Sequence, residues 1–292
     1  MAMNRITSTS NTKVKRLVTL KKKRKARDEE KVFLVEGIRM FREIPLRILR
    51  EVYVSETFYN KEPGVIGDIL SGGGPAQNAD TGMPVVEILS DTVFDYVSDT
   101  RTPQGILCVA RQAEYTLGEI FTYCPRMTDG CRPHILVLDH LQDPGNLGTI
   151  FRAAEGAGVT GIIMDRECVD VYNPKTIRST MGSVYRMPFC YADHLPDAVR
   201  DLKKSGVRTY AAHLDGRCDY DEEDYCGPCA FLIGNEGNGL TKEIADLADT
   251  YIRIPMKGQV ESLNAAVAAS VLMFEAARQR RKSRVSAREP LM

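Results

Sequence analysis

The run His134-Ile-Leu-Val-Leu138 constrains the fold more than any other feature of this sequence. Apolar residues that follow one another without polar alternation are typical of a strand covered on both faces, as in a parallel sheet. Further short apolar runs follow it, and they alternate with stretches of helical periodicity up to about residue 281. This alternation predicts an α/β domain over residues 133–292.

The first part of the chain shows the same alternation on a smaller scale. Short strands are predicted at residues 32–35, 52–54, 85–89 and 105–110, with helices between them. They indicate a second, smaller α/β domain at residues 31–112 with a mixed or parallel sheet. Residues 113–132 lack periodicity and are interpreted as a linker. A chain of 292 residues is long enough for two separate cores.

The balanced net charge conceals a segregation of charges. The chain holds 39 basic and 39 acidic residues, yet residues 1–50 hold 15 basic against 5 acidic ones, and residues 275–292 hold six against two. Residues 1–30 are therefore interpreted as a basic, helical N-terminal arm, and a polyanion is the expected partner of the two ends. A solvated charge run remains the alternative.

The sequence also predicts the compartment. No apolar run reaches the roughly 18 residues of a membrane-spanning helix, and no apolar segment follows the basic start as in a secretory signal. We therefore expect a cytoplasmic protein without a membrane partner. The eight cysteines are expected to be free thiols, as is usual in a reducing compartment.

Two motifs invite cofactor interpretations that their context does not favour. Gly156-Ala-Gly-Val-Thr-Gly161 has dinucleotide-loop spacing, but a helix precedes it and a strand follows, the reverse of the required order. We interpret Gly156 and Gly158 as a helix end and turn. Cys226-Gly-Pro-Cys229 has dithiol spacing, but a strand follows at once, so a Gly-Pro turn is favoured over redox or zinc chemistry.

Three segments rich in Gly and Asn follow predicted strands of the second domain, where α/β sheets bind ligands. They are Asp139–Glu155, Phe231–Leu240 and Ile254–Ser270. The first combines Gly145 and Gly148 with Arg152 on one predicted helix, and the last places Ser262 and Asn264 in the predicted first turn of a helix rich in alanine. Each segment alone has a structural explanation, such as a capping residue or a close helix packing.

In this order, the segments resemble the three signature motifs of the TrmH/SpoU family of RNA ribose methyltransferases, within the SPOUT superfamily. The matching stretches are Asp143–Arg152, Gly234–Leu240 and Ile254–Ala268, with a fourth at Lys175–Pro188. Phe33–Gly37 and Ser98–Ile106 look like parts of the family's small RNA-binding domain. The resemblance thus covers nearly the whole chain.

The resemblance implies a C-terminal α/β domain with a deep trefoil knot, plus a small N-terminal α/β RNA-binding domain. It implies S-adenosylmethionine (AdoMet) as cofactor, a homodimer, and no metal. The implied cofactor-binding residues are Gly234, Ile254, Leu263, Ala212, Met256 and Gly239. The implied catalytic residues are Arg152, Asn146, Glu236, Ser262 and Asn264, with Arg152 facing a partner's cofactor.

The implied reaction is attack of a ribose 2′-hydroxyl on the sulfonium methyl group. The family proposal makes the Arg152 guanidinium the activating group, but a guanidinium is hard to deprotonate, so a phosphate clamp is the alternative role. Large-subunit ribosomal RNA is the favoured substrate and transfer RNA the alternative. A methyltransferase for antibiotic resistance, a catalytically silent RNA-binding module and, more distantly, a dehydrogenase stay open.

Overall fold

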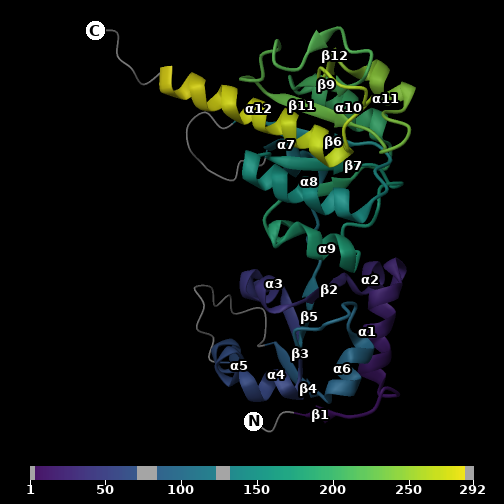
Figure 1. Cartoon of the computed structure of the whole chain (residues 1–292), viewed down its shortest axis with the longest axis vertical. Helices are drawn as coiled ribbons and strands as arrows, with labels where there is room; N and C mark the ends of the chain where they lie inside the picture. Colours follow the sequence, from purple (N-terminus) through teal and green to yellow (C-terminus); the bar gives the residue numbers. More distant parts are fainter. Residues whose placement is uncertain (1–3, 71–83, 123–131, 287–292) are drawn as a thin grey trace. The chain divides into compact units, whose positions relative to one another are not determined.

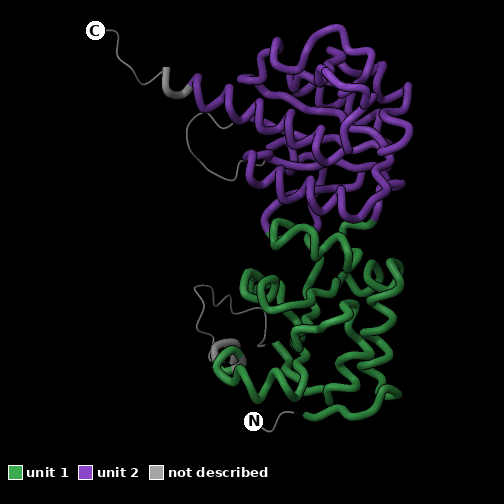
Figure 2. Tube along the Cα trace, viewed as in Figure 1, with its two compact units in different colours: residues 1–113, 170–185 green, residues 114–169, 186–292 purple. Residues whose placement is uncertain are grey.

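The structure, a computed structural model, describes residues 4–70, 84–122 and 132–286. The chain forms two compact units, residues 1–113 with 170–185 and residues 114–169 with 186–292 (Figure 2). The sequence predicted consecutive domains, whereas here residues 170–185 leave the second unit and join the first. Each unit has its own sheet.

The first unit is built on a mixed five-stranded sheet. Its strands, in spatial order, are β1 (Arg5–Ile6), β4 (Val85–Leu89), β3 (Leu49–Ser55), β5 (Ile106–Arg111) and β2 (Val32–Glu36). β4 runs parallel to β1 and β3, and β5 runs antiparallel to β3 and β2. The four predicted strands are present, while the two residues of β1 are too few to give a periodic signal.

Helices surround this sheet (Figure 1). They are α1 (Thr12–Lys22), α2 (Arg24–Glu30), α3 (Ile38–Glu43), α4 (Glu56–Lys61), α5 (Pro63–Leu70), α6 (Asp91–Val97) and α9 (Pro174–Thr180), with 3-10 turns at η1 (Leu46–Ile48) and η2 (Ser183–Tyr185). α9 and η2 replace the single helix predicted for residues 174–184, because the chain turns left-handed at Met181 and Gly182.

The predicted basic arm is part of the first unit's core. Val14, Leu17 and Leu20 on α1 are fully buried, and α1 packs beside α6 (Figure 1). On its polar side, Arg16 forms ion pairs with Glu30 and Glu51. The spacing of the apolar residues places them on one helix face, and burial of that face holds the segment in the unit.

A buried ion pair ties residues 170–185 to the first unit. The Arg27 Nη2 atom lies 2.5 Å from an oxygen of Asp170, and both residues are less than one tenth exposed. Nearby, the Tyr172 hydroxyl accepts from the Ala113 N–H at 2.8 Å, and the Tyr185 hydroxyl donates to the Met40 carbonyl. Apolar packing adds to these polar contacts, because Tyr172 and Tyr185 lie against Phe33 with ring centroids 4.7 and 6.4 Å apart. All of these contacts join residues distant in the sequence, so no local pattern reveals them.

The second unit contains the parallel sheet that the sequence predicted. Its seven strands, in spatial order, are β10 (Cys218–Asp219), β12 (Thr250–Arg253), β9 (Arg208–Ala212), β11 (Cys229–Ile233), β6 (His134–Leu138), β7 (Gly161–Met164) and β8 (Phe189–Tyr191). All neighbouring strands run parallel. The short β8 and β10 were not predicted. The trefoil knot stays a prediction.

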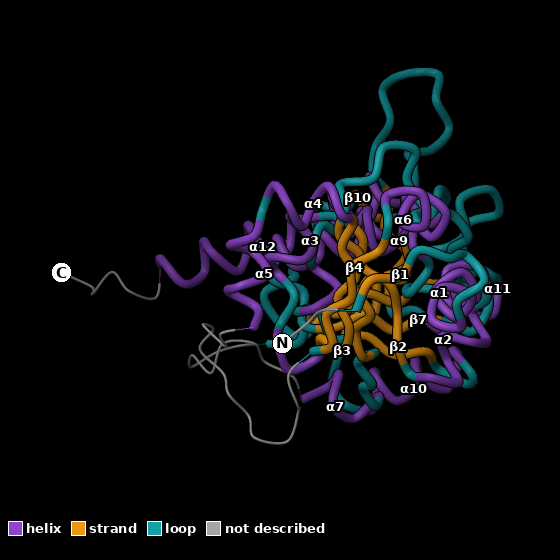
Figure 3. Tube along the Cα trace, turned by 90° about the horizontal axis from the view of Figure 1, so that it is seen from below, coloured by secondary structure: helices purple, strands orange, loops and turns teal. Residues whose placement is uncertain are grey.

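The helices of the second unit are α7 (Leu117–Thr122), α8 (Pro144–Ala157), α10 (Leu195–Lys204), α11 (Lys242–Leu247) and α12 (Ala265–Ser286), and α12 packs along α8 (Figure 1). In Figure 3, helices such as α7, α10 and α12 lie around the strands, which are drawn in orange. α7 falls within the predicted linker, but Ile120 is fully buried against Gly161. Residues 123–131 of that linker lie outside the described residues. None of the described helices is both long and apolar enough to cross a bilayer.

The structure explains the two misleading motifs as turns. Gly158 takes a left-handed conformation with φ of 75° and ends α8, as predicted, so the Gly156–Gly161 motif is a helix end followed by β7. Cys229 is the first residue of β11 and is buried. Burial raises the pKa of its thiol to about 11, which is opposite to the shift that a reactive dithiol needs.

Candidate functional site

The glycine-rich segments meet at the carboxyl edge of the parallel sheet. Ile233, the last residue of β11, is paired with Leu138, the last residue of β6, so the loops that follow both strands start side by side. β9 and β12 end at the same edge, with Ala212 opposite Ile252. Ligands of open α/β sheets bind at this edge.

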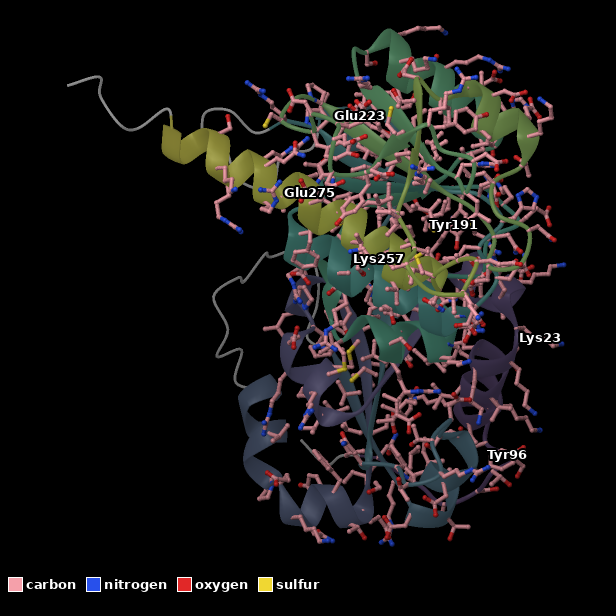
Figure 4. The ribbon with its side chains drawn as sticks, turned by 45° about the horizontal axis from the view of Figure 1, so that its top comes forward. Lys23, Tyr96, Tyr191, Glu223, Lys257 and Glu275 are labelled. Atoms are coloured by element: carbon pink, nitrogen blue, oxygen red, sulfur yellow. The ribbon has the colours of Figure 1, made fainter. Side chains whose placement is uncertain are left out.

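A cavity of about 720 Å³ opens there. Its walls come from the ends of β9, β11 and β12 and from the loop that leads from β12 into α12, in which Lys257 is labelled (Figure 4). This volume lies within the roughly 300–1,000 Å³ of cofactor and small-ligand sites. The cavity mixes apolar walls with backbone groups of the glycine loop and the Glu236 carboxylate.

Most of the predicted site residues line this cavity. All six residues expected to bind the cofactor are among them, together with two of the expected catalytic residues: Ala212, Gly234, Gly239, Ile254, Met256 and Leu263, with Glu236 and Ser262. Asn146 and Asn264 stand behind Glu236 in a hydrogen-bond chain. Arg152 is exposed on α8 and does not line the cavity.

Gly234 is required by the packing of its own loop. A Cβ atom at this position would lie 2.0 Å from the carbonyl carbon of Gly239 and 2.1 Å from the nitrogen of Leu240. Asn235 and Gly239 exchange backbone hydrogen bonds of 2.9 and 3.0 Å, which close the loop directly against Gly234. The backbone therefore forms the cavity wall, without a side chain between it and a ligand.

Glu236 connects this loop to the start of α8. One carboxylate oxygen accepts the Asp143 N–H at 2.9 Å and the Asn146 side-chain amide at 3.0 Å, and the other accepts the Gln142 N–H at 3.1 Å. Partial burial alone would raise the pKa of Glu236, but these donated bonds outweigh it and hold the pKa below its usual value. Glu236 is therefore an ionised carboxylate that links the 234–240 loop to the start of α8.

The sequence predicted Asn264 in the first turn of a helix, but Asn264 is the N-cap residue before that helix. α12 begins at Ala265, so Ser262 and Leu263 belong to the preceding loop. The Asn264 side-chain oxygen accepts the Ala266 N–H at 2.9 Å, and its amide donates to the Asn146 side-chain oxygen at 2.9 Å. Asn264, Asn146 and Glu236 thus join all three motifs in one chain of hydrogen bonds.

Gly145 has a local explanation that the sequence did not suggest. Asp143 caps α8 by accepting the Asn146 N–H at 2.8 Å, and a Cβ atom at Gly145 would lie 2.9 Å from that same carboxylate oxygen. The glycine therefore makes room for the cap. Arg152 itself lies on the exposed side of the helix.

The sequence reasoning missed a cluster behind the cavity loops. Asp139, His140 and Asp165 place their ligand-type atoms within 4.8 Å of one another. The His140 Nδ1 atom hydrogen-bonds to Asp139 at 2.7 Å and lies 2.8 Å from Asp165, which also accepts the His140 backbone N–H at 2.6 Å, so contacts within the cluster account for it. The usable signal was Asp139-His140 directly after a buried strand, where loops carry site residues.

The fold and site together define an α/β enzyme domain that binds a small cofactor at the carboxyl edge of its sheet, joined to a second α/β unit. Residues 133–274 match the SpoU rRNA Methylase family, and residues 11–108 match the MRM3-like substrate binding domain. The chain is 33% identical over 274 residues to the 23S rRNA (guanosine(2553)-2′-O)-methyltransferase RlmP of Bacillus subtilis (strain 168), covering 93% of this chain and 98% of the relative.

Solved structures agree with these matches. The AdoMet-bound rRNA methyltransferase from Sinorhizobium meliloti is 31% identical with a TM-score of 0.78, covering 94% of this chain and 98% of that one. The AdoMet complex of the SpoU methyltransferase AviRb from Streptomyces viridochromogenes is 25% identical with a TM-score of 0.73, covering 92% and 98%. The chain belongs to the SpoU/TrmH family of AdoMet-dependent RNA 2′-O-ribose methyltransferases, which confirms the family, the enzyme class and the α/β domain types predicted from the sequence.

Proposed function

We propose that this protein methylates the 2′-hydroxyl of a ribose in large-subunit ribosomal RNA, with AdoMet as methyl donor, in the cytoplasm. The observation that carries the proposal is the cavity at the carboxyl edge of the sheet, which gathers the six expected cofactor residues in one place. The similarity to a 23S rRNA methyltransferase over 93% of the chain favours ribosomal RNA over transfer RNA.

The cavity fits the donor in both size and chemistry. A volume of about 720 Å³ accommodates a molecule of AdoMet's size, and the backbone wall at Gly234 and Gly239 offers close approach to a flat, polar ring. Ile254, Leu263 and Ala212 supply apolar lining. When bound, the donor supplies an electrophilic methyl group on a cationic sulfur.

We assign positioning roles to the hydrogen-bonded side chains. The Glu236 carboxylate already accepts three bonds from residues 142–146, so it fixes the loops and is not free to take up a proton. Asn146 and Asn264 extend the same chain to the start of α12. Ser262 is exposed on the cavity wall, where its hydroxyl is available to the reacting ribose.

Arg152 acts across a homodimer in this proposal. It is exposed on α8, outside the cavity of its own chain, so a second copy is needed to bring it to a cofactor. The neighbouring α12 exposes Val267 and Phe274 by about half, and burying such an apolar pair in a dimer is favourable. There the guanidinium binds a phosphate beside the target ribose or stabilises the negative charge that develops on its oxygen. No metal takes part.

The test is methyl transfer from tritiated AdoMet to deproteinised ribosomal RNA, transfer RNA and assembled ribosomal subunits from cells that lack the gene. We expect label at a 2′-oxygen of large-subunit RNA, free or in particles. Arg152→Ala should lower the rate by at least about 100-fold, as loss of a charge-stabilising group does. Arg200→Ala, which removes an exposed arginine on α10, is the matched control.

Label only in transfer RNA would replace the proposed substrate. RNA binding without label in any fraction would overturn the enzymatic proposal in favour of a silent binding module. A monomer at working concentration that retains full activity would contradict the role of Arg152 across a dimer.

A further inference from the structure

His140 occupies a backbone conformation that its side chain does not require. Its φ is +57°, in the left-handed region, where residues other than glycine are uncommon and where asparagine, aspartate and histidine are enriched among them. Its side chain is 46% exposed, so it contributes little to a core. The turn tolerates histidine, so the contacts of the imidazole determine its role there.

The imidazole faces two buried carboxylates. Its Nδ1 atom lies 2.7 Å from Asp139 and 2.8 Å from Asp165, residues that are 1% and 7% exposed. Asp139 also accepts two bonds from Thr241, and Asp165 accepts the backbone N–H groups of His140 and Cys168. Two neighbouring buried carboxylates are costly unless a positive charge accompanies them.

This cluster lies at the start of the loop that donates backbone hydrogen bonds to Glu236. The His140 carbonyl accepts the Asn235 side-chain amide at 2.8 Å. The next residues of the loop, Gln142 and Asp143, donate their N–H groups to Glu236. Asp139 reaches the far end of the same glycine loop through Thr241. The loop of residues 139–143 is thus anchored at both ends of the cavity wall formed by residues 234–241.

We propose that His140 is a positioning residue for methyl transfer: its imidazolium binds Asp139 and Asp165 together and so keeps the 139–143 loop, and through it Glu236, in place beside the cofactor cavity. The inference rests on the proposed function of that cavity. It assigns a role in the reaction to a residue outside the three motifs.

The charged form of His140 is favoured by its surroundings. The hydrogen bond to Asp139 raises the pKa of His140 above its usual 6.5 and, with the charges of Asp165 and Glu167, outweighs partial desolvation. A raised pKa means that the stabilisation is complete below pH 6.5 and is lost as the pH rises through the pKa of the folded protein. Loss of the His140 charge is therefore expected to weaken the loop anchoring at alkaline pH.

The experiment compares wild type, His140→Asn and His140→Lys in initial methylation rates and AdoMet affinity from pH 6 to 9.5. Asparagine accepts the left-handed turn but carries no charge. Lysine stays charged over this range, and Lys31 shows that a lysine takes a φ of 54° in this same chain. Imidazole titration by NMR in wild type and Asp165→Asn measures the charge state directly.

We expect the wild-type rate, relative to His140→Lys, to fall about tenfold across the alkaline limb, as loss of a charge-assisted hydrogen bond predicts. His140→Asn should be slow throughout, without that limb. Asp165→Asn should shift both the limb and the NMR titration to lower pH. Parallel pH profiles in wild type and His140→Asn would overturn the inference, as would a pH-independent loss of RNA affinity alone. If the wild type transfers no methyl group at any pH, the proposed function fails instead.

Discussion

Glu36 in the first unit and Glu236 in the second perform the same mechanical task with different results. Each carboxylate accepts three hydrogen bonds from a segment distant in the sequence, Glu36 from residues 98–100 and Glu236 from residues 142–146. The cavity beside Glu36 measures about 10 Å³, room for one water at most, whereas the cavity beside Glu236 measures about 720 Å³.

The difference lies in what surrounds each carboxylate. The space beside Glu36 is lined by side chains on all sides, both charged ones (Lys21, Asp99 and Arg178) and apolar ones (Leu34, Val97, Leu107 and Ile177). Glu236 is surrounded by Gly234, Gly237 and Gly239, which bring no side chains to the wall. Glu36 thus links loops around a closed space, whereas Glu236 links loops around an open cavity. The residues next to each carboxylate determine whether a binding site forms beside it.

The largest effect is expected from the first unit's buried ion pair. Asp170→Ala leaves the Arg27 guanidinium, which is 3% exposed, without its counterion. Breaking a buried pair in this way costs about 3–5 kcal/mol of unfolding free energy. Urea unfolding measures the loss. Asp99→Ala, which removes a half-exposed partner of Arg178, is the control and should cost about 1 kcal/mol or less. Equal losses in both variants would mean that residues 170–185 do not depend on burial of the pair.

The second effect tests whether glycine keeps the cavity open. Gly234→Ala places a methyl group within 2.0 Å of the Gly239 backbone, which no side-chain movement relieves. We expect AdoMet affinity to fall by about 100-fold, equivalent to about 3 kcal/mol. Gly258→Ala in the third motif adds its methyl group to open space and should bind normally, as measured by calorimetry. Normal binding by both variants would show that the wall at Gly234 does not form the cofactor site.

The third prediction compares Glu236 with Glu36 directly. Glu236→Gln replaces a carboxylate oxygen with an amide that faces N–H donors, and we expect kcat/KM to fall by about 10- to 100-fold, as loss of charge-assisted bonds predicts. Glu36→Gln makes the same change in the first unit, and it should lower thermal stability while leaving AdoMet affinity unchanged. If Glu36→Gln weakens AdoMet binding as strongly, the division of tasks between the two units is wrong.

Sequence reasoning succeeded where one strong local pattern decides the structure. The run at residues 134–138 predicted a buried parallel strand, and the helix–glycine–strand order predicted the turn at Gly158. The residues that the family resemblance implied for cofactor binding all line one cavity, and their roles stay a prediction. Here local sequence and tertiary structure agree.

Sequence reasoning failed where contacts between residues distant in the sequence determine the structure. Residues 170–185 join the first unit through contacts such as Asp170 with Arg27 and Tyr172 with Phe33, and no local pattern connects these positions. The start of α12 was placed too early because Val260 and Leu263 continue the apolar pattern into a loop, while the Asn264 cap sets the true start. His140 was passed over because its two carboxylate partners come together only through the register of β6 and β7.

The smallest effect we predict is a pH dependence that belongs to the second unit alone. His134 at the start of β6 is 1% exposed, and its Nε2 atom has no hydrogen-bond partner. Burial, with the nearby Arg280 charge, lowers the pKa of His134 to about 3. Between that value and the usual 6.5, the unfolded chain binds a proton that the folded chain excludes. Stability therefore falls as the pH drops below 6.5, by about 1.4 kcal/mol for each pH unit from this residue.

His134→Phe removes this proton and keeps a ring against Phe231, which the imidazole already meets edge-on at 5.9 Å. Urea unfolding at pH 7.5, 6.5 and 5.5 should show a shallower decline for this variant, by about 1.4 kcal/mol at one unit below pH 6.5. His194→Phe, the same substitution at a histidine that is 58% exposed, is the control and should leave the decline unchanged. Identical slopes in wild type and His134→Phe would mean that the folded protein admits the proton, and that β6 is less tightly enclosed than its burial indicates.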